Sequence, residues 1–91
     1  MTGETRPRLA KKARLKIDPI EKKSVLLSPE RGLVLSASAA EILARCDGER
    51  TVERISAELA DGTQAALEDV RRDVVAFLEE MARRGFVELG G

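Results

Sequence analysis

Residues 45–52 read Arg-Cys-Asp-Gly-Glu-Arg-Thr-Val (RCDGERTV) and mark a corner between two predicted helices. Gly48 stands where a helix commonly ends in a left-handed residue, a conformation that glycine adopts at little steric cost. Thr51 is a favourable N-cap for the next helix, and Glu53 suits the positive end of that helix. The stretch therefore predicts a tight turn between two helices.

Cys46, the chain's only cysteine, lies in this corner. It falls one turn after Ile42 and Leu43, on the inward face of the first helix, where a free cysteine usually behaves as a small hydrophobic residue. A reactive thiol needs a pKa lowered by a cation or by a helix N-terminus, whereas a helix C-terminus raises it. The pattern favours a structural cysteine over a reactive one.

Helical periodicity extends from the corner in both directions. Before it, residues 38–41 have the S-x-x-E form of a capping box, which predicts the start of the first helix. After it, a second helix runs to Asp61-Gly62. A third is predicted over residues 65–84, with Gly85 ending it. The apolar residues of the third helix recur at helical spacing and form its buried stripe: Leu67, Val70, Val74, Phe77, Leu78 and Met81.

Three short runs before the helices have the pattern of β-strands. Residues 14–18 alternate polar and apolar side chains, and residues 23–28 and 33–35 follow, with a turn over residues 28–32. Residues 86–89 either form a short terminal strand or pack down without one. The predicted fold class is α+β and winged helix-turn-helix-like, with an N-terminal three-stranded antiparallel sheet followed by three helices.

The length of 91 residues predicts one domain. Residues 1–12 are polar, basic and interrupted by Pro7, so they predict a flexible N-terminal arm before a single domain over residues 13–91. Residues 1–23 hold eight Lys and Arg against three acids, and residues 24–91 hold eight Arg against thirteen acids. We interpret this split either as a solubilising tail beside an acidic helical surface, or as a basic segment that attracts an acidic partner.

Composition argues against several classes of protein. No run of about 18 apolar residues is present, so no membrane span is expected, and the N-terminus lacks the apolar centre of a secretory signal. A lone cysteine forms no internal disulfide, which agrees with a cytoplasmic location. The chain has no histidine, the commonest general base and transition-metal ligand, and no phosphate-binding or nucleophile motif. We expect no catalytic residue, no cofactor, no metal site and no enzymatic activity.

A DNA-binding function is the natural alternative for a winged helix, which reads the major groove with one helix. Here the third helix is acidic, and phosphate repels such a surface. Its acids and bases are Glu68, Asp69, Asp73, Glu79 and Glu80 against Arg71, Arg72, Arg83 and Arg84. We expect no nucleic-acid partner, although a winged-helix DNA-binding or other protein-interaction module stays open as the alternative.

A peptide-binding function needs an exposed sheet edge beside an apolar groove, because a peptide can then add as an extra strand. The apolar arc of the third helix is wider than the stripe of about 100° that faces one core. Val75 lies at one margin of this arc, with Leu78 and the stem of Arg71 between it and the core stripe. Val75 is therefore either a groove residue or a lone exposed apolar residue.

Short motifs spread over nearly all of residues 6–88 carry a family resemblance. They are Arg6-Pro7-Arg8-Leu9-Ala10, Ala13-Arg14-Leu15, Val25-Leu26-Leu27-Ser28-Pro29-Glu30, Ser38-Ala39-Ala40-Glu41-Ile42-Leu43, Cys46-Asp47-Gly48-Glu49-Arg50-Thr51-Val52, Asp73-Val74, Phe77-Leu78 and Arg84-Gly85-Phe86-Val87. In this order they resemble the pyrroloquinoline quinone (PQQ) biosynthesis protein D family (PqqD). One departure is Ser36, where that family often has Asn; Ser also caps a helix.

The resemblance implies a peptide chaperone in PQQ biosynthesis and a recognition element for ribosomally made, modified peptides. Its partners would be the precursor peptide PqqA and the radical S-adenosylmethionine (SAM) enzyme PqqE, which joins a Glu and a Tyr side chain of that peptide. The resemblance also implies that the peptide docks as a strand beside the third strand and against the third helix. It leaves open a monomer or a domain-exchanged dimer.

Transferred to this chain, the resemblance gives a peptide-binding edge, and the helical wheel adds a wall from the third helix. The edge comprises Gly32, Leu33, Val34, Leu35 and Ser36. The wall comprises Arg71, Arg72, Val75 and Leu78, where the two arginines would also pair with acids on the peptide.

Overall fold

The structure is a computed structural model that describes residues 1–29 and 31–90. Glu30, in the turn predicted over residues 28–32, and the terminal Gly91 lie outside the described residues. Within these ranges the strands are β1 (Arg8–Leu9), β2 (Arg14–Ile17), β3 (Ser24–Leu27), β4 (Gly32–Leu35) and β5 (Val87–Glu88). The helices are α1 (Ala37–Ala44), α2 (Val52–Asp61) and α3 (Leu67–Arg83).

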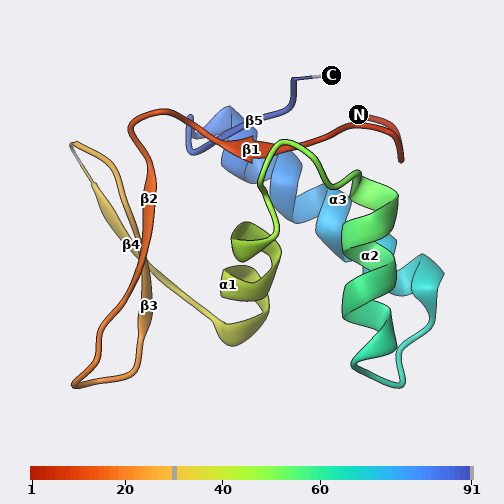
Figure 1. Cartoon of the computed structure of the whole chain (residues 1–91), viewed down its shortest axis with the longest axis horizontal. Coiled ribbons are helices and arrows are strands. Elements are labelled where there is room, and N and C mark those ends of the chain that lie inside the picture. Colours follow the sequence, from red (N-terminus) through yellow and green to blue (C-terminus); the bar gives the residue numbers. More distant parts are fainter. Residues whose placement is uncertain (30, 91) are drawn as a thin grey trace.

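Strands β2, β3 and β4 form an antiparallel meander, with β3 in the centre. In Figure 1 this sheet lies on one side of the molecule, and α1 stands between it and the pair of helices α2 and α3. The three-stranded sheet followed by three helices confirms the α+β, winged helix-turn-helix-like fold predicted from the sequence. The residue ranges of the three strands agree with the prediction to within one position at each end.

A tight corner joins α1 and α2 as predicted, but α1 ends at Ala44 with Arg45 as its C-cap, before the Gly48 that was expected to end it. Gly48 has a φ of +79°, in the left-handed region. The Thr51 side chain accepts a hydrogen bond from the backbone N–H of Arg54 at 3.1 Å and so caps α2. Gly85, with a φ of +84°, follows the end of α3. None of the helices in the described ranges combines the length and apolar character that crossing a bilayer requires.

The start of α1 differs from the predicted capping box. Ser36, not Ser38, is the N-cap, and its side chain accepts a hydrogen bond from the backbone N–H of Ala39 at 3.2 Å. Ser36 keeps the extended backbone conformation of β4, which is the conformation an N-cap requires. Because the helix then begins at Ala37, Ser38 already lies inside the first turn.

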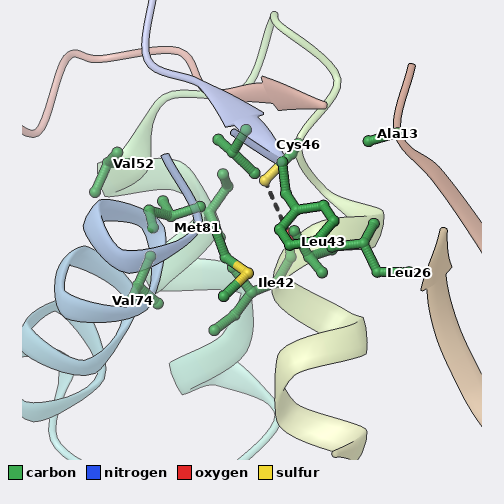
Figure 2. Close-up of a cluster of buried hydrophobic side chains, with 12 residues drawn as sticks. Ala13, Leu26, Ile42, Leu43, Cys46, Val52, Val74 and Met81 are labelled. Carbon is green, nitrogen blue, oxygen red and sulfur yellow. Dashed lines mark hydrogen bonds between the residues drawn. The ribbon is translucent and has the colours of Figure 1, made fainter. Parts of the chain in front are cut away.

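The core is aliphatic and is built around α1. In Figure 2, Leu26 from β3, Ile42 and Leu43 from α1, and Val74 and Met81 from α3 point toward a common interior. These side chains are buried to more than nine-tenths of their surface, and burying an aliphatic side chain stabilises the folded state by about 1.5–3 kcal/mol. Through α1, one core joins the sheet to the other two helices.

Residues 1–10 lie against the domain, which differs from the flexible arm expected for residues 1–12. β1 pairs antiparallel with β5, and Pro7 is fully buried. The backbone N–H of Val52 donates to Thr5 O at 2.8 Å, and that of Glu53 donates to Gly3 O at 3.0 Å. The first N–H groups of a helix lack partners within the helix, so the N-terminal segment satisfies donors that α2 leaves free.

Candidate functional site

β4 is an edge strand of the meander. It pairs with β3 on one side, and no strand in the described part of the chain pairs with its other side. Its sequence, Gly-Leu-Val-Leu, has no charged side chain. An uncharged edge with unpaired backbone groups is a template for a further strand, so β4 meets the first requirement for binding an extended peptide.

The turn before β4 fixes the direction of its backbone groups. Ser28 N–H donates to Arg31 O at 2.8 Å and Arg31 N–H donates to Ser28 O at 3.4 Å, so these two residues form a hydrogen-bonded pair. Hydrogen-bonded and non-hydrogen-bonded pairs alternate along antiparallel strands. Leu33 therefore turns its N–H and C=O toward β3, whereas Gly32 and Val34 turn theirs toward the free side.

The opposite edge of the sheet, β2, is less receptive to another strand. It carries Arg14 and Lys16, and charged residues on an edge strand discourage further pairing. Just after the end of β2, Asp18 N–H donates to Lys23 O at 2.7 Å, so Asp18 and Lys23 form a hydrogen-bonded pair. Because such pairs alternate with non-hydrogen-bonded ones, the neighbouring Ile17 turns its N–H and C=O away from β3, toward the outside of the sheet. The sheet thus has two unpaired edges, of which β4 is the uncharged one.

The side chains of the proposed edge fall on two faces of the sheet. Leu33 is directly opposite the fully buried Leu26, so Leu33 and Leu35 face the core and are half-buried. Val34 points to the other face and keeps 66% of its surface exposed. The Ser36 hydroxyl caps α1 and is therefore already engaged.

The residues expected to form a helical wall divide into two environments. Arg71, Arg72 and Val75 gather in a shallow hollow of about 500 Å³ on α3, together with Glu68, Ala76 and Glu79. No β4 residue lines this hollow. Arg71 is turned toward α2, with its Nε 3.4 Å from Glu53 Oε2. The structure therefore does not bring these residues together with the edge of β4.

Leu78 has a different role from the one expected. It is fully buried in the core, at the centre of the buried stripe of α3. A side chain with no exposed surface cannot form the wall of a groove for a guest peptide. The buried face of α3 consists of residues that recur at helical spacing, namely Val74, Leu78 and Met81.

A second hollow, the α1–α3 hollow, lies on the margin of α3 that faces α1. It measures about 220 Å³, and α1 contributes Ser38, Glu41 and Ile42, beginning three residues after the end of β4. From α3 it has Val70, Asp73 and Val74. Sequence reasoning missed this hollow, because a helical wheel gives the width of an apolar arc without saying which margin faces a neighbour. Val70, at the edge of the buried stripe, was one signal in the sequence.

Cys46 is a structural residue. Its thiol donates to Ile42 O at 3.3 Å, the dashed bond in Figure 2, and the residue is buried. Burial, reinforced by the nearby charge of Asp47, raises the pKa of the Cys46 thiol to about 12. The thiolate that nucleophilic chemistry needs is therefore scarce at neutral pH, and the structural interpretation of Cys46 agrees with this environment.

Glu58 of α2 is the centre of a cluster of ion pairs at the corner between α1 and α2. Its carboxylate accepts from the Nε atoms of Arg45, Arg50 and Arg54 at 3.0, 3.2 and 3.0 Å. These three hydrogen bonds hold the pKa of Glu58 below its ordinary value, and the bond from Arg54 has the largest effect. Arg50 also pairs with Asp47, and backbone N–H donors lower the pKa of Asp47. Because these three arginines all bind the Glu58 carboxylate, the cluster joins the end of α1 and the following turn to α2.

Comparisons with known proteins agree with this architecture. The family model described as Coenzyme PQQ synthesis protein D (PqqD) matches residues 23–87. A protein named "PqqA binding protein" from Rhizobium meliloti (strain 1021) is 35% identical over 89 residues, which cover 98% of this chain and 91% of the relative.

Two solved structures share the fold. The solution structure of the PqqD truncation of Methylobacterium extorquens PqqCD superposes with a TM-score of 0.82 at 32% identity, covering 97% of this chain and 94% of that one. It is described as a functional, stand-alone recognition element for ribosomally synthesised and post-translationally modified peptides. Lasso peptide synthetase B1, solved with its leader peptide, has a TM-score of 0.79 at 19% identity over 91% of this chain and 98% of its own. The second likeness is one of fold alone.

Proposed function

This chain belongs to the coenzyme PQQ synthesis protein D (PqqD) family, and we propose that it binds the ribosomally made precursor peptide PqqA as a strand added to β4. The name of the Rhizobium meliloti relative and the description of the Methylobacterium extorquens structure support a peptide ligand. The observation that carries the proposal is the uncharged, unpaired edge of β4, with the backbone groups of Gly32 and Val34 turned outward.

Each residue of the proposed edge has a distinct part. Gly32 and Val34 exchange backbone hydrogen bonds with the peptide, and Ser36, two positions on, offers the next outward N–H. Leu33 and Leu35 face the core side, where they form an apolar floor beside the peptide's inward side chains. Backbone pairing supplies affinity, and the side-chain surroundings supply selectivity.

The benefit to a modifying enzyme is entropic. A short precursor peptide is disordered in isolation, and fixing one backbone residue costs about 1–2 kcal/mol. A domain that holds the peptide as a strand meets this cost before the reaction and raises the peptide's local concentration at a bound enzyme. We propose that the enzyme served is the radical SAM enzyme PqqE, in the cytoplasm where the peptide is made, and that this chain contributes binding and no catalytic group.

A titration with synthetic PqqA tests the proposal. Calorimetry should show saturable binding, and the largest backbone-amide NMR shifts should fall within residues 32–36. Duplex DNA, which the acidic α3 repels, should not bind. Size-exclusion chromatography of the same samples identifies the binding species, because a domain-exchanged dimer that covers β4 has no free edge. Absence of peptide binding, or shifts confined to α3, would refute strand addition.

A further inference from the structure

A basic hollow lies at the beginning of the β4 edge. It measures about 310 Å³ and lies where the segment before β2, the turn before β4 and the end of α3 meet. Its floor includes the buried residues Ala13 and Phe86. We call it the cationic hollow, because Lys12, Arg31 and Arg84 line it and none of the described lining residues is acidic.

The three cations are unequally engaged. Arg84 pairs with Glu80, its Nε lying 2.8 Å from Glu80 Oε2. Among the described residues, no ion pair is formed by Lys12 or Arg31, and both are exposed. Cations that line one hollow and of which two have no ion pair among the described residues favour an anionic group, and planar guanidinium matches carboxylate geometry.

The position of the cationic hollow relates it to the proposed peptide site. Arg31 immediately precedes Gly32, the first residue of β4. Arg31 also lies two residues before Leu33, and residues two apart share a face of a strand, so Arg31 is on the core-facing side. If a peptide adds as a strand to β4, the core-facing side chains at one end of the peptide lie next to this hollow.

The other end of the β4 edge has the opposite charge. The α1–α3 hollow, which begins just after β4, is rimmed by Glu41 and Asp73. A carboxylate on the guest is therefore attracted at the Arg31 end and repelled at the Glu41 end. This asymmetry distinguishes the two directions in which a peptide could add, because the backbone ladder alone permits either.

We propose that the cationic hollow binds a carboxylate side chain of the guest peptide and thereby sets the direction and register of the added strand. The inference rests on the proposed function, since it assumes a strand on β4. It assigns Lys12 and Arg31 as specificity residues outside the edge itself. The ligand chemistry is a carboxylate on an extended peptide.

The test compares neighbouring lysines. Lys12→Glu reverses a charge that lines the hollow, and Lys11→Glu makes the same change at an exposed residue that does not line it. Titration of synthetic PqqA should give an affinity about five- to tenfold weaker for Lys12→Glu and Arg31→Glu, with the difference shrinking at high salt, and little change for Lys11→Glu. A PqqA version with Asp and Glu replaced by Asn and Gln should bind the native chain more weakly and should not discriminate among the variants.

Three results would overturn the inference. Equal affinities for Lys12→Glu, Arg31→Glu and Lys11→Glu would remove both residues from recognition. Unchanged binding of the neutralised peptide would show that no guest carboxylate is read. Saturable binding of inorganic phosphate, detected as NMR shifts of the amides around Arg31, would indicate a site for free anions if the neutralised peptide also binds with native affinity. All three require that native PqqA binds; absence of that binding refutes the proposed function itself.

Discussion

Val34 on β4 lies directly opposite Val25 on β3, and the two form a non-hydrogen-bonded pair of the antiparallel ladder. The N–H and C=O of Val34 consequently take no part in holding β4 to the sheet. The position can therefore be altered with little effect on the β3–β4 ladder while the free edge loses a donor.

Val34→Pro is expected to weaken binding of PqqA by at least about tenfold, because proline removes the outward N–H and its ring obstructs the incoming strand. The fold should persist, since proline is tolerated in edge strands whose N–H faces solvent. Calorimetry gives the affinity, and circular dichroism checks the fold.

Ile17→Pro is the matched control for this experiment. It removes an outward donor from the other edge, β2, at a residue whose side chain is 69% exposed. Its affinity for PqqA should equal that of the native chain. The assignment to β4 fails if a folded Val34→Pro variant binds normally, or if Ile17→Pro is the variant that loses affinity.

The wall residues on α3 require a separate test. Arg72 is exposed and lies in the hollow with Val75, on the opposite margin of the buried stripe from Val70 and Asp73. If the peptide occupies β4 and the side facing α1, Arg72→Glu should change its affinity by no more than about twofold. A larger, salt-dependent loss in calorimetry would instead support the wall predicted from the sequence. Arg72 suits this test better than Arg71, because Arg71→Glu would oppose Glu53 across the α2–α3 interface.

The predictable parts of the fold are those fixed by nearby residues. Thr51 caps α2 and Gly48 takes the left-handed conformation, both as their own backbone preferences predict, but Gly48 does not end the first helix, because α1 already ends at Ala44 with Arg45 as its C-cap. The meander follows from short turns, which oblige successive strands to pair antiparallel. The third strand was predicted from its short apolar run after a turn, whereas its part as the peptide-binding edge came from the family resemblance alone.

The missed parts depend on contacts distant in sequence. Pairing of β1 with β5 joins residues 8–9 to residues 87–88, and no local pattern in a basic, proline-containing segment reports such a partner. Leu78 points into the core and Val75 lies away from β4 because α1 packs between the sheet and α3. Ser36 and Ser38 are both acceptable caps, and only the end of β4 decides between them.

The N-terminal segment should contribute to stability, contrary to the behaviour of a free arm. Deletion of residues 1–9 removes β1, the buried Pro7 and the acceptors for the first N–H groups of α2. We expect the free energy of unfolding to fall by about 2 kcal/mol or more. Urea denaturation measures the loss, and deletion of residues 1–2 alone, which spares the Gly3 and Thr5 acceptors, is the control. Equal stability of the two deletions would show that the segment is dispensable.

The ion cluster at the helical corner predicts how stability depends on pH. Hydrogen bonds from Arg54, Arg50 and Arg45 lower the pKa of Glu58 in the folded state. Its contribution is therefore fully present above the ordinary pKa of a glutamate and is lost as the pH falls through the lower folded value. Thermal unfolding followed from neutral pH to about pH 3 should show a steeper loss of Tm in the native chain than in Glu58→Gln.

Glu79→Gln is the control for this measurement, because Glu79 is exposed and makes no ion pair among the described residues. It should follow the native pH profile. At neutral pH Glu58→Gln should be less stable than either protein, since three guanidinium groups lose their common carboxylate, and the difference should narrow in acid. Parallel profiles for Glu58→Gln and the native chain would show that the cluster adds no pH-dependent stability and that the corner is held by Gly48 and the Thr51 cap alone.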